Sequence, residues 1–192
     1  MAEYSSTQSA ILDVAQELVQ TRGYNAFSFR DVADRVGIRS ASIHHHYRTK
    51  SDLGVAMLIR YRAGFSEALT DIAEQHSEYE DALHAFSVLF ADTLDAKRMC
   101  LCGTLAVEFE TLSPEMQSEV RGFFVESEDW LEKLFAAAHE AGRIRTCESP
   151  RGLAATFLST VEGAMMCVRA VGDEGRLWTA VNQFKRQIER EC

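Results

Sequence analysis

The sequence predicts an all-α protein, and three observations support this. Only two of the 192 residues are proline, so long stretches contain no residue that interrupts a helix. Apolar side chains recur three and four residues apart through most of the chain. Hydrophobic residues make up 46% and charged residues 26%, which is the composition of a folded globular protein. We expect about nine helices, arranged as an N-terminal three-helix domain over residues 1–52 and a larger helical bundle over residues 53–192.

The first forty residues contain the signals of two helices. Apolar residues at helical spacing follow Ser5, and Gly23 stands where a left-handed residue is expected to end that helix. Ser28 and Asp31 have the S-x-x-D spacing of a capping box, in which each side chain bonds a backbone amide at a helix start. A short apolar face follows, and Gly37 ends it.

Two more helices follow. A short one is expected over residues 40–47, and Thr49 and Asp52 repeat the capping pattern where a long helix begins at Lys50. Two short helices joined by a tight turn at Gly37, with another helix behind them, are typical of a helix-turn-helix, whose second helix enters the major groove of DNA. The alternative is an ordinary small helical subdomain, which has the same caps and glycine stops.

The charge is distributed unevenly. The chain carries a net charge of −9, which by itself argues against nucleic acid as a partner. Residues 1–62, however, hold eight basic and six acidic side chains, for a net of +2, whereas the remaining 130 residues hold twelve basic and twenty-three acidic ones, for a net of −11. Because salt limits the reach of a charge to about 8 Å at physiological ionic strength, the N-terminal part can still bind phosphates.

The remainder of the chain is expected to be helical throughout. Ser113-Pro114 and Ser149-Pro150 each fit an N-cap followed by proline at the first helical position. Gly142 and Gly172 stand where helix-terminating glycines belong. From these signals and the apolar spacing we expect helices over residues 50–76, 79–94, 99–109, 114–141, 149–171 and 173–190.

Several classes of protein are disfavoured. No apolar run approaches the ~18 residues of a membrane span and no signal peptide is evident, so we expect a cytoplasmic protein without a membrane partner. The five cysteines are odd in number and scattered, which argues against a disulfide framework. Neither a cofactor nor a metal is expected. The adjacent residues His44–His46 point about 100° apart around a helix and therefore do not converge on one ion.

The N-terminal motifs, taken together, resemble the DNA-binding domain of TetR/AcrR-family transcriptional regulators. The resemblance covers about residues 8–55 and lies in the order and spacing of Ile11-x3-Ala15-x2-Leu18, Gly23-Tyr24, Phe27–Ala33, Val36–Ile38 and Ile43–Leu53. It implies a homodimeric repressor that binds a palindromic double-stranded operator and releases it when a small apolar or reactive effector binds the C-terminal bundle.

The resemblance and side-chain chemistry together give the candidate DNA contacts. Ser28 is expected to meet a phosphate at a helix start, and Lys50 to act as a phosphate-contacting point charge. Ser40 and His44 share a face of the recognition helix and are expected to read base edges. The full candidate set is Ser28, Arg39, Ser40, Ala41, Ser42, His44, His45, Tyr47 and Lys50.

Three positions depart from the usual family pattern. The family usually has Ser or Thr where Arg39 stands, as the cap of the recognition helix. It commonly has Gly where Ala41 stands and Tyr where His44 stands. Arg39 cannot cap by accepting a hydrogen bond, but its guanidinium can reach a phosphate or a guanine. These departures put the operator sequence in question more than DNA binding itself.

The resemblance also implies an effector cavity and a dimer interface. Glu108 is a candidate acid of the cavity, with a solvent-facing or interface-facing position as the alternative. The candidate effector contacts are Phe86, Phe90, Cys102, Leu105, Glu108, Phe124 and Met165. The candidate interface residues on the last two helices are Phe157, Val161, Ala164, Val168, Trp178, Val181 and Phe184. The alternative interpretation is that both sets are ordinary core, and that the last two helices pack on each other inside one chain.

Two competing functions stay open. Some regulators of the resembled family respond to electrophiles or oxidants through cysteines, and Cys100 and Cys102 lie beside Lys97 and Arg98, which favour a thiolate. A helical enzyme is the other alternative. The chain has no nucleophile elbow, P-loop, dinucleotide-binding glycine fingerprint or H-E-x-x-H motif.

Overall fold

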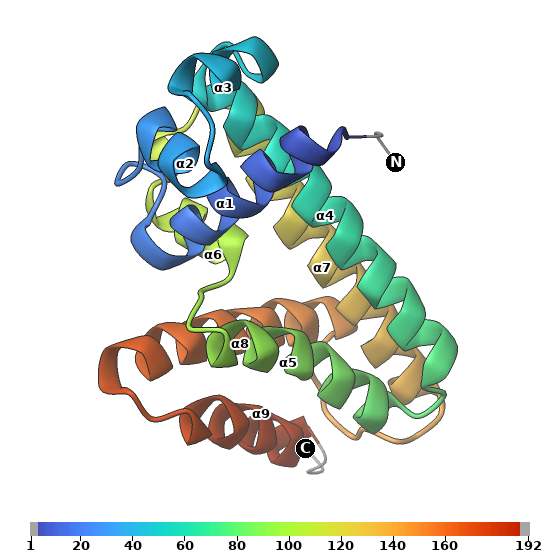
Figure 1. The fold of residues 1–192 in the computed structure, drawn as a ribbon. Coiled ribbons are helices and arrows are strands. Elements are labelled where there is room, and N and C mark those ends of the chain that lie inside the picture. The colour runs from blue at the N-terminus through green and yellow to red at the C-terminus, as the bar shows by residue number, and fades with distance from the viewer. Residues whose placement is uncertain (1–3, 189–192) are drawn as a thin grey trace. The chain divides into compact units, whose positions relative to one another are not determined.

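The computed structural model describes residues 4–188, and within them it contains α-helices, one 3-10 helix and no strand (Figure 1). The all-α prediction is confirmed, and nine α-helices lie in this part of the chain. They are α1 (Ser6–Arg22), α2 (Phe29–Val36), α3 (Ser40–His46), α4 (Lys50–Gln75), α5 (Tyr79–Asp95), α6 (Leu101–Val107), α7 (Pro114–Glu140), α8 (Pro150–Val171) and α9 (Gly175–Ile188), with η1 (Phe109–Thr111) after α6.

The chain divides into two compact units. The first contains the residues up to Phe65 together with Cys100–Phe123, and the second contains Ser66–Met99 together with the residues from Phe124 onward. The long helices α4 and α7 therefore each contribute one part to each unit. The division expected at residue 52 is a functional one, between DNA recognition and effector binding. It stays a prediction.

The capping signals of the first two helices are confirmed. Ser5 forms a capping box with Gln8 at the start of α1, and Ser28 forms one with Asp31 at the start of α2. Gly37 ends α2 in the left-handed conformation, with φ 78° and ψ 30°. Gly23 ends α1 with a positive φ of 93°, but its ψ of 160° lies outside the left-handed helical region that was expected.

The helix-turn-helix is built as the spacing predicts. The hydroxyl of Thr49 accepts from the Asp52 amide at 3.1 Å, and the Asp52 carboxylate accepts from the Thr49 amide at 2.9 Å, which closes the capping box of α4. Helix α2 packs on α1 and on α3 (Figure 1). The core of this unit is formed by fully buried residues that include Ile11, Leu12, Leu18, Ile43 and Leu53.

The second unit is centred on α8, which packs against α9 and α5 (Figure 1). Ser149 caps α8 and Pro150 is its first residue, as expected, and Gly172 ends it in the left-handed conformation. Aromatic rings fill the core: Phe157 lies 4.9 Å from Phe184 and 5.9 Å from Phe86, measured between ring centroids.

Two predicted helix boundaries differ from the structure. The helix expected over residues 99–109 is shorter, because the Cys100 sulfur caps it at Gly103 and the chain tightens into η1 after Glu108. The last helix begins at Gly175 rather than Asp173, whose carboxylate accepts from the Gly175 amide at 3.1 Å. The end expected at residue 190 lies outside the described residues.

Helix α8 is long and apolar enough to cross a membrane by length and composition, with a mean hydropathy of 1.2 over its best 18-residue window. The sequence was expected to contain no such segment. In the structure 39% of that window is buried inside the chain, where α8 is the central helix of the second unit.

Candidate functional site

The outer face of α3 carries most of the side chains expected to read DNA. One side chain of this helix, Ile43, is buried and holds it against the core. Ser40 is half-buried. The exposed residues of the predicted set on and before this helix are Arg39, Ala41, Ser42, His44 and His45. The structure therefore brings these residues together on one open surface next to α2.

The ring of His44 is held in place on this surface. It lies edge-on against Phe29 of α2, with ring centroids 4.8 Å apart. Its Nδ1 atom lies 3.4 Å from the backbone carbonyl of Arg48. Because a carbonyl only accepts, this contact requires a proton on Nδ1, and in the neutral ring Nε2 is then the acceptor.

Two arginines supply exposed positive charge beside α3. Among residues 4–188, neither Arg39 nor Arg48 forms a salt bridge, and both are exposed. By contrast, Arg35 of α2 is paired with Glu17 at 2.7 Å. As expected, Arg39 makes no side-chain cap to α3. Sequence reasoning missed Arg48, although a basic residue directly after a recognition helix is a readable signal for phosphate contact.

Ser28 has the predicted position but its hydroxyl is engaged. It donates to the Asp31 carboxylate at 2.6 Å, and the Ser28 amide donates to the same oxygen at 2.7 Å. These two bonds lower the pKa of Asp31 below its usual value. A phosphate at this helix start would compete with that carboxylate, so the phosphate contact of Ser28 stays a prediction.

Lys50, which was expected to act as a phosphate-contacting point charge, forms internal hydrogen bonds in the structure, and phosphate contact by it stays a prediction. Its ammonium donates to the carbonyls of Tyr24 at 2.5 Å and Phe27 at 2.6 Å, and it lies over both aromatic rings. Burial lowers the pKa of Lys50. Two of its three N–H donors therefore hold the connection between α1 and α2.

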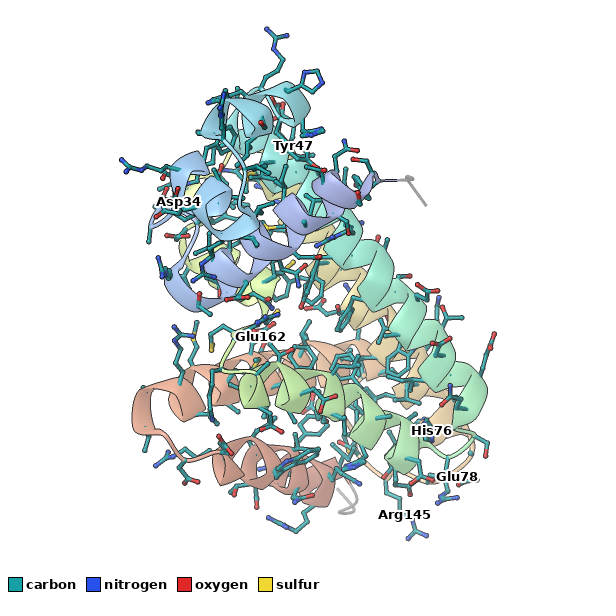
Figure 2. All side chains as sticks on the ribbon, in the orientation of Figure 1. Asp34, Tyr47, His76, Glu78, Arg145 and Glu162 are labelled. Carbon is teal, nitrogen blue, oxygen red and sulfur yellow. The ribbon has the colours of Figure 1, made fainter. Side chains whose placement is uncertain are left out.

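Tyr47 is also corrected. It was expected among the DNA contacts, but only 6% of it is exposed and its side chain lies within the N-terminal helices (Figure 2). Its hydroxyl has no hydrogen-bond partner within residues 4–188. Burial raises the pKa of Tyr47 to about 12. Tyr47 therefore belongs to the core under α3.

Glu108, a candidate acid of the effector cavity, links α6 to the DNA-binding helices in the structure, and effector contact by it stays a prediction. It caps the end of α6, and its carboxylate accepts from the Tyr24 amide at 2.6 Å and from the Asn25 amide at 3.3 Å. The side-chain amide of Asn25 also donates to the Glu108 carboxylate at 3.3 Å and to the Thr111 hydroxyl at 2.9 Å. The loop that leads into α2 is thus fixed to the end of α6.

The other candidate effector contacts lie in packed regions. Cys102 and Leu105 are fully buried in the first unit, and Phe86, Phe90 and Met165 are buried in the second. Phe86, for example, stacks on Trp130 with centroids 5.6 Å apart. Phe124 is half-buried in the second unit. The structure gives these residues packing roles, and effector contact by them stays a prediction.

Most of the candidate dimer-interface residues are covered within one chain, and their contact with a second copy stays a prediction. Phe157, Val161, Val168, Val181 and Phe184 are each at most 5% exposed, and Ala164 is 8% exposed. They pack α8 against α9 and the neighbouring helices, which is the alternative that the sequence left open. Trp178 is half-buried and stacks on His84 at 4.9 Å.

The cysteines differ in accessibility. Cys100 and Cys102 are buried free thiols, and Cys167 is an exposed free thiol. The Cys100 sulfur accepts from the Gly103 amide at 3.4 Å and lies 3.9 Å from the Tyr61 hydroxyl. Cys147 is disulfide-bonded. Cys192 lies outside the described residues. No group of three potential metal ligands occurs within residues 4–188.

Comparisons with known proteins agree with this arrangement. A family model described as "Bacterial regulatory proteins, tetR family" matches residues 11–57, and one described as "Tetracyclin repressor-like, C-terminal domain" matches residues 81–184. A TetR-family regulator from Agrobacterium tumefaciens is 32% identical with a TM-score of 0.92, over 96% of this chain and 98% of that one. A TetR regulator from Legionella pneumophila is 32% identical with a TM-score of 0.88, over 97% and 100% of the two chains.

A curated relative is the transcriptional repressor NemR of Escherichia coli K12, which is 23% identical over 144 residues, or 73% of this chain and 71% of NemR. The C-terminal family model alone spans more than half of the chain, and the N-terminal model spans the helix-turn-helix. The chain therefore belongs to the TetR family of bacterial regulatory proteins and is a DNA-binding regulator of transcription.

Proposed function

We propose that this protein is a cytoplasmic, dimeric repressor that binds an inverted-repeat operator and releases it when a small molecule binds the C-terminal bundle. The observation that carries the proposal is the outer face of α3, where Arg39, Ser42 and His44 are exposed around the buried anchor Ile43. Relatives named as repressors, NemR and KstR2 of Rhodococcus jostii, support repression as the direction of control.

The roles on α3 follow from side-chain chemistry. Arg39 and Arg48 carry the exposed positive charge that phosphate contact needs, and Arg39 at the start of α3 is also placed to reach a guanine. Ala41 and Ser42 are small and allow the helix to approach base edges. The neutral ring of His44, with Nδ1 bonded to a carbonyl, leaves Nε2 as an acceptor, which suits the amino group of adenine or cytosine.

A second copy of the chain would complete the DNA-binding unit, because one short recognition helix is too small for strong specific binding. Its docking face is the exposed side of α8. This side has no charged residue from Thr156 to Met166 apart from the half-buried Glu162, and it includes Ser159 and Gly163. A shallow hollow of about 420 Å³ is lined by Ala155, Thr156, Ser159 and Thr160 of the same helix.

Glu108 supports a route by which an effector would act on DNA binding. Any displacement of α6 acts on the amides of Tyr24 and Asn25, which lie five and four residues before Phe29, the first residue of α2. An effector shifts this equilibrium only by the difference between its affinities for the two arrangements, so the DNA-bound arrangement must bind it more weakly.

The test of DNA binding is selection of bound duplexes from a random pool, followed by affinity measurements at several salt concentrations. We expect an inverted repeat to be recovered. Arg39→Ala should weaken binding at least about tenfold, whereas Arg143→Ala, in an exposed ion pair of the second unit, should leave it unchanged. Recovery of no sequence, together with no binding of any duplex in dilute buffer, would refute the proposal.

The dimer is tested with two glycines that have nothing within 4 Å of an added Cβ, Gly163 on α8 and Gly64 on α4. Gly163→Glu places a charge on the proposed interface and should yield a monomer in sedimentation experiments. Gly64→Glu should leave the dimer intact. A wild-type protein that sediments as a monomer at micromolar concentration, or a Gly163→Glu variant that stays dimeric, contradicts the assignment of this face.

A further inference from the structure

We propose that His45 and His46, at the end of α3, couple DNA binding to pH, so that the protein holds DNA more tightly as these two side chains gain protons. The inference rests on the proposed function, because it assigns regulation to the same DNA-binding face. Three of the six histidines of the chain are consecutive and form the last turn of α3. Histidine is the side chain that ordinarily changes its charge between about pH 5 and 8.

The end of α3 needs positive side chains if it is to lie near phosphates. Carbonyls at the carboxyl-terminal end of a helix carry partial negative charge, which disfavours an anion and favours a cation. Arg48 supplies one permanent and exposed cation two residues after His46, the last residue of the helix. Protonated His45 and His46 would add two more. A charge that varies with pH therefore lies where phosphate binding depends on positive charge.

His45 and His46 form a pair without other partners. His45 is exposed and His46 is half-buried, and their rings lie edge-on with centroids 5.4 Å apart. Within residues 4–188 neither ring forms an ion pair or a hydrogen bond. Two positively charged rings at this distance repel each other, so in the free protein each charge opposes the other. Phosphates beside the pair offset that repulsion, and binding to DNA therefore favours the uptake of protons.

His44 differs from this pair. Its Nδ1 atom lies 3.4 Å from the Arg48 carbonyl, and its Nε2 atom is the acceptor proposed above to suit an amino group of a base. A proton on Nε2 removes that acceptor. Protonation of His44 therefore changes the base that it suits, whereas protonation of His45 and His46 adds charge without the loss of a hydrogen bond.

The charged groups on the helices around α3 are engaged with partners other than these two rings. The ion pairs are Arg30 with Asp34, Arg35 with Glu17, and Arg60 with Asp13, and the remaining carboxylates are Asp31, bonded to Ser28, and Asp52, bonded to Thr49. Lys50 donates to two carbonyls. Tyr47 stays neutral in this pH range, because burial raises its pKa to about 12. The exposed cations Arg39 and Arg48 oppose proton uptake in the free protein, and phosphates offset them as well.

The experiment measures the affinity of the full chain for the duplex recovered by selection, at about pH 8 and about pH 6. The gain in affinity between these two conditions should be about three- to tenfold smaller in His45→Gln than in wild type, and likewise in His46→Gln. Because His44 is present in all three proteins, its own response to pH cancels in these ratios. Circular dichroism verifies that each variant is folded, and if His46→Gln is not, the variants of the exposed His45 decide the question.

The salt dependence of binding shows whether the added charge acts on phosphates. Each neutralised phosphate steepens the slope of log affinity against log salt by about one, so the wild-type slope should be steeper at the lower pH. His45→Lys makes the charge at this position permanent. This variant should bind at least about threefold more tightly than wild type at about pH 8, and its response to pH should match that of His45→Gln.

His139→Gln is the matched control, since His139 is an exposed histidine in the last turn of α7, in the second unit. It should keep the full wild-type response to pH. Three results each overturn the proposal: an undiminished response in His45→Gln, an equal loss of response in His139→Gln, or a wild-type salt slope that is the same at both pH values. If no duplex binds at either pH, the proposed function fails and this inference fails with it, whereas operator binding that does not respond to pH refutes the inference alone.

Discussion

Replacement of Glu108 by alanine tests whether α6 holds the DNA-binding helices. The carboxylate accepts from the Tyr24 amide at 2.6 Å and from the backbone and side chain of Asn25 at 3.3 Å. Hydrogen bonds to a charged group contribute about 1.5–3 kcal/mol each when well formed. The two longer bonds are exposed, so we assign the change mainly to the Tyr24 bond and expect a loss of about 2 kcal/mol for opening of this loop.

The assay is amide hydrogen exchange, measured by mass spectrometry on peptides that contain Tyr24 and Asn25. A loss of about 2 kcal/mol corresponds to roughly thirtyfold faster exchange. Tryptophan fluorescence would not serve, because Trp130 and Trp178 both lie in the second unit.

The control is Glu110→Ala, which removes the same charge from an exposed residue two positions along the chain. If Glu108→Ala and Glu110→Ala accelerate exchange of the loop equally, the link through Glu108 is refuted. Glu108→Gln removes the charge and keeps one acceptor oxygen. The exchange rate of the loop amides in this variant should therefore fall between the rates in wild type and in Glu108→Ala.

Three further predictions follow from the same unit. Tyr47→Phe removes a buried hydroxyl without a partner, so it should raise the free energy of unfolding in urea by about 1 kcal/mol and leave operator affinity unchanged. Burial raises the pKa of Tyr47 to about 12, so the folded state favours the neutral phenol. The wild-type protein should therefore lose further stability relative to the variant as the pH rises from 10 towards 12. A several-fold loss of operator affinity in Tyr47→Phe would show instead that the hydroxyl reaches DNA. Gly37→Ala forces alanine into a left-handed conformation and should lower the free energy of unfolding by about 1 kcal/mol, as measured by thermal denaturation. Gly64→Ala, in an exposed helical position, should raise that free energy by about as much. If both substitutions change the free energy of unfolding in the same direction, these two assignments are contradicted. Lys50→Met should lower the free energy of unfolding by about 2 kcal/mol and leave the salt dependence of operator binding unchanged, whereas a slope reduced by about one would restore Lys50 as a phosphate ligand.

The helices and their ends were predictable because their signals are local. Ser28 and Asp31 lie three residues apart and close the same capping box in any context that allows a helix there. The order of caps, glycines and apolar residues was compatible with a helix-turn-helix and with an ordinary helical subdomain, and the family resemblance over residues 8–55 decided between them. The exposure of His44 followed from its place one turn after Ser40, about 100° around α3 from the buried Ile43.

The roles of Lys50 and Glu108 were not predictable, because they depend on partners distant in sequence. Lys50 bonds a carbonyl 26 residues away, and Glu108 bonds an amide 84 residues away. The packing of α8 was left open for a related reason. Its most apolar stripe, which includes Phe157 and Val161, is compatible in sequence with an interface to a second copy and with internal packing, and the structure buries it within the chain.

In helix α3 the residue that stabilises the fold is different from the residues expected to contact DNA. Its single buried residue, Ile43, fixes the helix to the domain, and of its exposed residues His44 also packs on Phe29 of α2. Surface substitutions away from packed or capped positions usually change stability by no more than about 0.5 kcal/mol. Mutation can therefore exchange Ala41, Ser42 or His45 at little cost to the domain, which lets a duplicated copy of such a gene acquire a new target sequence before it acquires a new fold.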